Sequence, residues 1–385
     1  MKKYMLRYLS YALVALVSCL MTLCILEATD RLESSKLDQL QAVIEECFIG
    51  ETDSTAMEDA AAAAMVESLG DRWSGYIPAS EYQDYVDRTQ NSYVGVGMSI
   101  RTLEDGSGFE IIRVEPNGPA NEAGVKAGDV VVAVFGQRVE GLNASDLSAQ
   151  VKGEAGTTVD LTFLRGEEEF TLTIERREIQ TIVAEGKMLE DRIGLVSIYN
   201  FDARCAEETI AAIETLLEQG AEKLIFDVRN NPGGYADELV KVLDYLLPEG
   251  PLFRSEYYTG KVTLDESDAD CLELPMAVLM NGDSYSAAEF FAAALEEYEA
   301  AVTVGQPTTG KGYFQTVTKL KDGSAVRLSV GKYTTPNGVS LAEVGGLVPN
   351  IAVEVDEETY MSIAAGTLEP EKDPQIQAAM EALKR

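Results

Sequence analysis

Residues Met280 to Tyr298, MNGDSYSAAEFFAAALEEY, run from the end of an apolar segment through a short polar turn into a second apolar segment. The first segment is short and wholly apolar, which is typical of a strand buried in a sheet. The residues that follow Ser286 are apolar on nearly all sides of a helical period, which predicts a buried helix. A buried strand that leads directly into a buried helix indicates an α/β fold.

The same alternation of strand and helix extends outward from this stretch, from Met188 to about Leu368. The expected strands are Ile193–Tyr199, Lys223–Arg229, Pro275–Met280 and Ala301–Gly305, and the expected helices are Glu207–Glu218, Asp237–Leu247 and Ser286–Tyr298. This order implies a largely parallel sheet with right-handed crossovers. Functional sites on such sheets gather at the carboxyl ends of strands, and two of those ends carry NNPGG (230–234) and NGDSYS (281–286).

A different pattern occupies Ser92 to Arg177, where glycines separate short runs of β-forming residues. About 85 residues of this kind are enough for a compact independent domain. The loop that opens this domain consists of Tyr93, Val94, Gly95, Val96 and Gly97. Such a loop can offer consecutive N–H groups to a carboxylate, so that an extended peptide adds as a strand beside it and against a helix expected at Ala144–Val151. The alternative is a glycine-rich hairpin loop without a ligand.

The N-terminal segment predicts a membrane anchor. Tyr8–Leu26 contains no charged residue, and as a helix it would span about 28 Å, enough to cross a bilayer core. Basic residues precede this segment and acidic residues follow it, which predicts an N-terminus inside the cell and an extracytoplasmic remainder. The alternative is a signal peptide whose cleavage would release a secreted protein. A lipoprotein cleavage box at Leu16–Cys19 is disfavoured, because the apolar run continues beyond Cys19.

Composition excludes several classes of function. The chain of 385 residues carries 31 basic and 65 acidic residues, a net charge of −34, which disfavours nucleic-acid binding. It contains no histidine, so a Ser-His-Asp triad and His-based metal sites are impossible within it. Its five cysteines lack the close spacing of a metal site. We therefore expect neither a metal nor a cofactor.

Ser284 and Ser286 are the candidate nucleophiles in the turn. Ser286 also fits the N-cap of the following helix, with Glu289 completing a capping box, so a purely structural role is the alternative. The same position lies beside the free N–H groups of a helix N-terminus, which would stabilise an oxyanion. Because no histidine is available, a lysine is the candidate base, since desolvation can lower the pKa of its amine toward neutrality.

Lys311 is that lysine. It lies in GQPTTGKGYFQT, directly after the strand expected at Ala301–Gly305, and the flanking Gly310 and Gly312 allow the backbone to approach other groups closely. If the residues from Lys311 onward form a strand, Gln315 shares a face with the lysine and can orient its amine. An exposed loop lysine is the alternative.

Two glycine motifs have competing interpretations. Gly233 and Gly234 can point backbone N–H groups into a shared crevice, as an oxyanion hole requires, although a tight strand-to-helix turn would use the same residues. The segment Gly305–Gly312 is similar to a phosphate-binding loop. However, Gly312 stands where that motif needs Ser or Thr, and a strand pattern follows where the motif needs a helix, so nucleotide binding is disfavoured.

Taken in order, these motifs resemble those of the C-terminal processing peptidases, a family of tail-specific serine proteases. The resemblance extends from about Ser35 to Glu357. It rests on FDVRNNPGG, NGDSYSAAEF, GKGYFQT and GSAVRLSVGKYTTPNGVSLAEVGGLVPN, and in the middle domain on YVGVG and GPANEAGVKAGDVVVAVFGQRVEG. It implies a PDZ domain that binds substrate C-termini and a serine protease core with a crotonase-like α/β fold.

The resemblance also implies roles for individual residues. The matching positions are Ser286 as nucleophile, Lys311 as base, Gln315 as the residue that assists the base and, for the oxyanion hole, the backbone N–H groups of Gly233 or Gly234 and of Ala287. Tyr285 departs from the family pattern, which often has only small residues in this turn. A bulky neighbour of the nucleophile could narrow or gate the site.

We therefore predict an α/β multidomain serine endopeptidase of the cell membrane, with a single N-terminal span and an extracytoplasmic catalytic part. The expected segments are an anchor or signal with its linker (1–34), a helical segment (35–90), a PDZ-like domain (91–177), a Ser-Lys protease core (178–368) and a charged C-terminal tail (369–385). The expected partners are proteins or peptides with free C-termini, the membrane and a second copy of the chain. The alternative is a membrane-anchored PDZ adaptor with an inactive protease fold.

Overall fold

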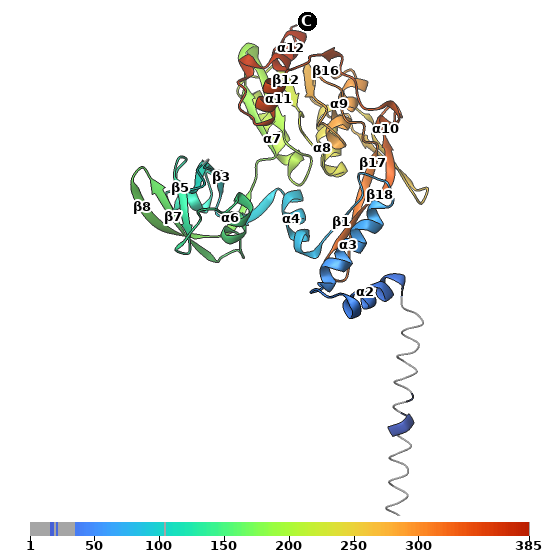
Figure 1. Ribbon diagram of the computed structural model, residues 1–385. Helices are drawn as coiled ribbons and strands as arrows, with labels where there is room; N and C mark the ends of the chain where they lie inside the picture. Colours follow the sequence, from blue (N-terminus) through green and yellow to red (C-terminus); the bar gives the residue numbers. More distant parts are fainter. Residues whose placement is uncertain (1–15, 19–20, 22–34, 104, 385) are drawn as a thin grey trace, which may run out of the picture. The chain divides into compact units, whose positions relative to one another are not determined.

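The computed structural model describes residues 16–18, 21, 35–103 and 105–384 (Figure 1). These residues form two compact units. The first contains the described residues up to Pro78 together with Val317–Leu328, and the second contains Ala79–Thr316 and the residues from Ser329 onward. Most of the predicted membrane span Tyr8–Leu26 lies outside the described residues. Within the described ranges, no helix is long and apolar enough to cross a membrane, so the anchor stays a prediction.

The first unit begins with two helices, α2 (Lys36–Cys47) and α3 (Ser54–Glu67). Each starts at a capping side chain: Ser35 accepts a hydrogen bond from the N–H of Asp38, and Asp53 accepts one from the N–H of Ala56. Neither helix contains a buried residue. Strand β1 (Gly75–Ile77) completes the unit by pairing with residues 325–327 of β18 (Ala325–Thr334).

Within the second unit, residues 98–175 form a sheet with its own core. Its strands are β3 (Met98–Thr102), β4 (Phe109–Val114), β5 (Val130–Val134), β6 (Gln137–Arg138), β7 (Thr158–Arg165) and β8 (Glu168–Glu175), and its helices are α5 (Pro119–Glu122) and α6 (Ala144–Val151). The strand order is β3-β4-β5-β7-β8, with β6 paired to β5. The sheet encloses an apolar cluster centred on Phe109, Leu161 and Phe163. The helix predicted at Ala144–Val151 is confirmed as α6.

The segments on either side of this domain also have regular structure. Helix α4 (Ala79–Thr89) precedes it, and strand β2 (Ser92–Gly95) pairs antiparallel with β9 (Arg177–Gln180). The domain is therefore bracketed by its own two-stranded ladder.

The remainder of the second unit is built on a six-stranded sheet. Its strands are β10 (Ala184–Met188), β11 (Ile193–Ile198), β12 (Lys223–Asp227), β15 (Met276–Met280), β16 (Ala301–Gly305) and β19 (Ile351–Ala352), in the order β10-β11-β12-β15-β16-β19. Only β10 runs antiparallel to its neighbour. The predicted, largely parallel sheet is thus confirmed, and the strands predicted at 275–280 and 301–305 are β15 and β16.

Helices cover both faces of this sheet, because side chains alternate between the faces along each strand. Helices α7 (Cys205–Glu218), α8 (Ala236–Leu246) and α9 (Ala287–Glu297) pack on one face, together with Leu224, Phe226 and Val278. Helix α12 (Pro374–Ala382) packs on the other face, beside Ile225 and Leu279. The result is a three-layer α/β/α arrangement whose strands end at the predicted site.

The segment predicted as a charged C-terminal tail forms one of these layers. Asp373 caps α12 by accepting hydrogen bonds from the N–H groups of Gln375 and Ile376. Ile376, Ala379 and Leu383 are buried against the sheet. The helix is therefore an integral part of the core.

The other elements of the second unit surround the sheet. They are β13 (Gly250–Tyr257), β14 (Val262–Ser267), β17 (Tyr313–Lys319), α10 (Leu341–Val344), α11 (Glu357–Ala364) and two 3-10 turns, η1 (Glu190–Arg192) and η2 (Pro370–Lys372). Strand β13 pairs with β14 and with residues 331–334 of β18.

Candidate active site

The serine turn connects β15 to α9, as the sequence predicted. Ser286 is the N-cap of α9 and has φ 60° and ψ −124°, a backbone conformation that residues with a side chain rarely adopt. Its backbone N–H donates to Oε1 of Glu289 at 3.0 Å. The preceding turn and the buried helix hold this conformation, so the serine is presented in a fixed orientation at the carboxyl end of β15.

Ser284, the other candidate nucleophile, is fully buried. Its hydroxyl donates to the carbonyl of Val228 at 2.7 Å and accepts the N–H of Asn281 at 3.0 Å. These contacts tie the serine turn to the end of β12, which is a structural role.

Lys311 lies in the loop between β16 and β17. Gly310 has φ +80°, and a Cβ atom added there would lie 2.7 Å from the backbone N of Gly346. Lys311 is buried, with an exposed fraction of 9% for the whole residue, and its Nζ atom lies 5.9 Å from the ring centroid of Tyr285. The alternative of an exposed loop lysine is therefore wrong. The residues that follow form strand β17 and not the helix that nucleotide binding would need.

Glu289 connects the serine turn to the lysine loop. Its carboxylate is fully buried in α9 and accepts hydrogen bonds from the backbone N–H groups of Ser286, Gly310 and Lys311 and from the hydroxyl of Thr308, at 2.6 to 3.0 Å. Burial raises the pKa of this carboxyl group, and the four hydrogen bonds oppose the rise. The sequence indicated only the capping contact, because the lysine loop follows 22 residues later.

The glycine loop lies directly beside the serine. A Cβ atom added at Gly233 would lie 2.7 Å from the Cβ of Ser286 and 2.8 Å from the N of Ala287. The N–H of Gly233 already donates to Oδ1 of Asn231 at 2.8 Å. By contrast, the N–H groups of Gly234 and Ala287 donate to no group among the described residues. Gly234 and Ala287 are thus the pair with free donors.

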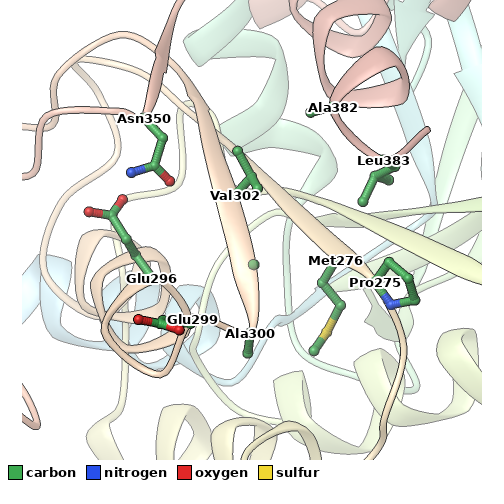
Figure 2. Close-up of a pocket in the computed structure, with 10 residues that line it drawn as sticks. Pro275, Met276, Glu296, Glu299, Ala300, Val302, Asn350, Ala382 and Leu383 are labelled. Carbon is green, nitrogen blue, oxygen red and sulfur yellow. The ribbon is translucent and has the colours of Figure 1, made fainter. Parts of the chain in front are cut away.

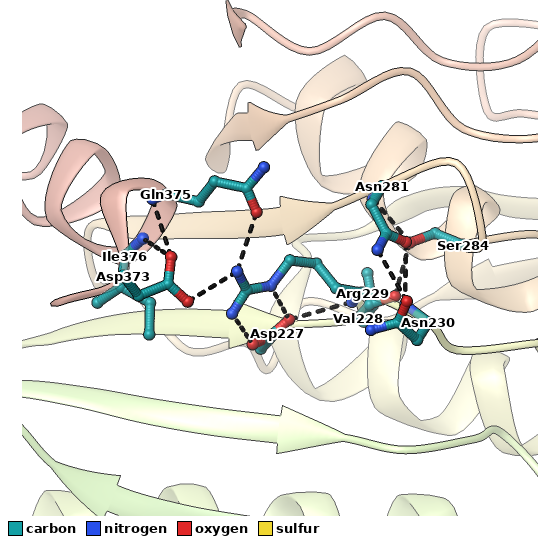
Figure 3. A network of polar contacts seen from close by, with 9 residues as sticks. All are labelled: Asp227, Val228, Arg229, Asn230, Asn281, Ser284, Asp373, Gln375 and Ile376. Atoms are coloured by element: carbon teal, nitrogen blue, oxygen red, sulfur yellow. Dashed lines mark hydrogen bonds and ion pairs between the residues drawn. The ribbon is translucent and has the colours of Figure 1, made fainter. Parts of the chain in front are cut away.

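A buried ion-pair network fixes the strand end that leads into this loop (Figure 3). The guanidinium of Arg229 is 4% exposed and contacts Asp227 at 2.6 Å and Asp373 of the α12 cap at 2.8 Å. Burial alone would lower the pKa of Arg229, but the two carboxylates outweigh this effect and raise it above the ordinary value. Side-chain amides of Asn230 and Asn281 then join the glycine loop to the serine turn at 2.9 Å.

Tyr333 contacts both the serine and the lysine. It is fully buried, and its hydroxyl donates to the carbonyl of Lys311. Burial and the nearby Glu289 raise the pKa of Tyr333 well above its ordinary value, while a side-chain hydrogen bond with Ser286 opposes the rise. The hydroxyl therefore remains protonated and acts as a donor at neutral pH.

Gln315 lies on β17, as the sequence predicted. Its side-chain amide donates to the carbonyl of Tyr313 at 3.2 Å and to Oγ of Ser329 at 3.0 Å. Its assistance to Lys311 stays a prediction.

The predicted carboxylate loop is divided between strand β2 and the two residues that separate it from β3. Tyr93, Val94 and Gly95 belong to β2, whereas Val96 and Gly97 lead into β3. The carbonyls of Val96 and Gly97 accept hydrogen bonds from Ala120 and Glu115. Their N–H groups, however, donate to no group in the described part of the chain. Two adjacent donors are thus available at the start of β3, beside α6.

The backbone of Asp202 lies against the glycine loop. A Cβ atom added at Gly234 would lie 2.5 Å from the backbone N of Asp202. The Asp202 carboxylate makes no hydrogen bond or ion pair with any described residue. Burial raises the pKa of this carboxyl group to about 7, and Arg88 opposes the rise.

Asp202→Asn is expected to stabilise the protein increasingly as pH rises. The folded-state pKa of about 7 exceeds the unfolded value of 3.8, so the parent loses stability between these two values and no further above them. The Asp202→Asn variant does not lose this stability, because its amide does not ionise. Its advantage in free energy of unfolding should grow from pH 4 to pH 7 by, at most, on the order of 4 kcal/mol. Urea unfolding between pH 4 and 8 measures this, with the exposed Asp237→Asn as control, and an advantage that does not change with pH would contradict it.

An open cavity of about 460 Å³ lies at the opposite ends of the same strands (Figure 2). Pro275 and Met276 at the start of β15 line it, together with Ala301 at the start of β16 and Leu383 after α12. None of the predicted catalytic residues lines this cavity, so it is separate from the serine turn.

Several known proteins are similar to this chain. The model of peptidase family S41 matches residues 192–353, and that of the PDZ domain matches residues 92–175. The carboxy-terminal processing protease CtpA of Bacillus subtilis (strain 168) is 30% identical over 351 residues, 86% of this chain and 74% of that protein. A CtpA-like serine protease of Staphylococcus aureus (strain MSSA476) is 27% identical over 348 residues, 89% of this chain and 69% of that protein.

A solved structure shares the fold. The crystal structure of a protein of Bacteroides fragilis NCTC 9343, described as an S41 protease, aligns with a TM-score of 0.53 and 16% identity, over 90% of this chain and 97% of that chain. The resemblance drawn from the motifs is thereby confirmed, as are the PDZ domain and the α/β protease fold.

Proposed function

Because the chain belongs to the C-terminal processing proteases of peptidase family S41, we propose that Ser286 and Lys311 are its catalytic dyad. The observation that carries the proposal is their shared partner. The backbone N–H groups of both residues donate to the same atom, Oε1 of Glu289, at 3.0 and 2.6 Å. The amine of Lys311 also contacts the ring of Tyr285, the residue next to Ser286.

The dyad accounts for each proton in peptide cleavage. The neutral amine of Lys311 accepts the proton of the Ser286 hydroxyl as Oγ attacks the scissile carbonyl carbon. When the C–N bond breaks, the ammonium returns this proton to the leaving amine, and an acyl-enzyme remains. Water then attacks the ester while Lys311 accepts its proton, and the Lys311 ammonium returns this proton to the Ser286 oxygen as the acyl group is released. Ser286, Lys311 and one water molecule supply every group that these steps need.

Backbone N–H groups stabilise the tetrahedral oxyanion in this proposal. Gly234 and Ala287 are favoured, because their donors are free, whereas the N–H of Gly233 binds Asn231. Ala287 is the first residue of α9, so the positive end of the helix dipole adds to the stabilisation.

The PDZ domain binds the C-terminal tail of the substrate in this proposal. The free N–H groups of Val96 and Gly97 suit a carboxylate. Met98 and Ile100 on β3 are partly buried and apolar, as is Val151 on the neighbouring α6, which favours an apolar tail.

For the location of the protein, we propose a single membrane span at Tyr8–Leu26 with the catalytic part outside, or secretion after cleavage of this segment. The exposed apolar side chains of Leu37, Leu40 and Val43 on α2 support self-association through the N-terminal helices.

The alternative of an adaptor with an inactive protease fold is not favoured. A pseudoenzyme usually lacks its nucleophile or its base, whereas both Ser286 and Lys311 are present here. The curated relatives are named as proteases.

The test of this function is cleavage of an unfolded protein with an apolar C-terminal tail, compared with the same protein whose C-terminus is amidated. We expect the amidated substrate to be cut with at least about tenfold lower kcat/KM, because it cannot accept hydrogen bonds from Val96 and Gly97 as a carboxylate. Mass spectrometry of the products identifies the bond that is cut. Equal cleavage of both substrates would contradict tail recognition, and tail binding without any cleavage would favour the adaptor.

A further inference from the structure

Tyr285, the residue of the serine turn that directly precedes Ser286, has no role in the proposed mechanism. It stands between the buried Ser284 and the strained Ser286, where the family often has a small residue. Its own N–H donates to the carbonyl of Asn231 at 3.2 Å, and its carbonyl accepts the N–H of Ala288 at 3.3 Å. The backbone of Tyr285 is therefore held from both sides, and its side chain is only partly exposed.

The ring of Tyr285 faces the amine of Lys311. The distance from Nζ to the ring centroid is 5.9 Å, which is within the range in which an aromatic face attracts a cation. Lys311 as a whole residue is 9% exposed, so little water competes for this contact. An aromatic face stabilises the ammonium form of the lysine and has no comparable attraction for the neutral amine.

Other elements also bring polar groups to the lysine. Helix α9 contributes the carboxylate of Glu289, which binds the Lys311 backbone N–H, and β18 contributes the protonated hydroxyl of Tyr333, which binds the Lys311 carbonyl. Helix α10 packs on Gly312 through Ala342, and its one carboxylate, Glu343, is exposed. The Glu289 and Tyr333 contacts are with the backbone of Lys311, whereas burial of this residue favours the neutral amine.

We propose that Tyr285 is a positioning residue of the dyad, whose ring holds the Lys311 ammonium and thereby determines the lowest pH at which the protease is active. This inference rests on the proposed function, because it assumes that the neutral amine of Lys311 is the base. Stabilising the ammonium delays its deprotonation to higher pH. The enzyme therefore operates in a more alkaline range than the same dyad without the ring.

The test uses the full-length chain in detergent and compares Tyr285→Leu and Tyr285→Phe with the parent. Leucine keeps an apolar side chain but removes the aromatic face, whereas phenylalanine keeps the face and removes the hydroxyl. We expect the acidic midpoint of the kcat/KM profile to fall by roughly half a unit to one and a half units in Tyr285→Leu. In Tyr285→Phe the midpoint should stay within a few tenths of a unit of the parent, which is about the resolution of such a profile.

A second measurement observes the amine without substrate. Competitive acetylation by a trace of acetic anhydride, quantified at Lys311 by mass spectrometry at each pH, reports the protonation of this amine directly. The same downward shift is expected there in Tyr285→Leu. If the leucine variant does not fold, Tyr285→Met replaces it, because methionine also lacks an aromatic face. Tyr258→Leu, at a tyrosine that is 82% exposed, is the matched control and should leave both midpoints in place.

The outcomes distinguish a failure of the role proposed for Tyr285 from a failure of the Ser286–Lys311 dyad. An unchanged midpoint in Tyr285→Leu, with kcat/KM lowered equally at every pH, would show a merely structural role and overturn the inference. An equal shift in Tyr285→Phe would assign the effect to the hydroxyl and also overturn it. If Lys311→Ala cleaved as well as the parent, the dyad itself would fail, whatever Tyr285 does.

Discussion

Ser286→Ala and Lys311→Ala are each expected to reduce kcat/KM for an unfolded substrate by roughly 10,000-fold or more. Alanine at position 286 removes the attacking oxygen, and alanine at position 311 removes the group that accepts its proton. Neither a histidine nor Glu289 can replace the base, because the chain contains no histidine and the Glu289 carboxylate is occupied by four hydrogen bonds. Cleavage is followed by the release of a fluorescent peptide, with substrate binding measured separately.

Lys311→Arg tests whether Lys311 acts as a base or only as a positive charge. Arginine keeps the charge but stays protonated at every accessible pH, so it is expected to be as inactive as alanine. Activity in the arginine variant would mean that the lysine acts electrostatically and that the base lies elsewhere.

Two controls accompany these variants. Ser284→Ala should lower the free energy of unfolding by about 1 to 2 kcal/mol, because the Val228 carbonyl loses its donor, but should still cleave. Lys332→Ala, at a lysine that is half exposed on β18, should leave activity unchanged. Cleavage that survives Ser286→Ala and is lost in Ser284→Ala would reassign the nucleophile.

Glu289→Ala is expected to lower kcat/KM by a factor of at least about 100 and the free energy of unfolding by roughly 3 kcal/mol or more. The change leaves the N–H groups of Ser286, Gly310 and Lys311 without their acceptor in a buried site. Each unpaired donor costs about 1 to 3 kcal/mol, and the lysine loop would lose its connection to the serine turn. Urea unfolding and steady-state kinetics measure the two effects.

Two further variants, Glu289→Gln and Glu299→Ala, test whether these losses depend on the Glu289 carboxylate. Glutamine keeps one acceptor oxygen but turns an NH₂ group toward N–H donors, so its losses should lie between those of the parent and of alanine. Glu299 lies just beyond the end of α9, and its side chain is exposed, so its alanine variant should behave as the parent does. Parental activity in Glu289→Ala would show that the loops keep their positions without the carboxylate.

The sequence predicted those parts of the fold that depend on local periodicity. Strand β16 and helix α6 have the predicted bounds, because the spacing of apolar residues reports which side of an element is buried. The predicted strand Lys223–Arg229 ends earlier, at Asp227, and the Arg229 side chain pairs with Asp227 and with Asp373 of the α12 cap. The sequence indicated a charged tail after residue 369. In the structure, however, Ile376, Ala379 and Leu383 lie on one face of a helix and are buried.

The candidate site also has features that the sequence predicted and features that it could not predict. Order and spacing of the motifs singled out Ser286, Lys311 and the two glycines, since these residues stand at strand ends that a parallel sheet brings to one edge. The burial of Lys311 and the choice between Gly233 and Gly234 depend on contacts with residues far away in the chain. The sequence does not specify which distant residues come into contact. The burial of Lys311 and the choice of glycine therefore could not be predicted.

By itself, the sequence determined the order of the elements, the family and the residue types available for chemistry, because these follow from local pattern and composition. Only the tertiary structure decided how these residues are held. Glu289 reads as a helix cap in the sequence, yet the fold brings Thr308, Gly310 and Lys311 onto the same carboxylate. The physical reason is that a buried carboxylate must collect hydrogen-bond donors from whichever segments pack around it, and packing is a property of the folded chain.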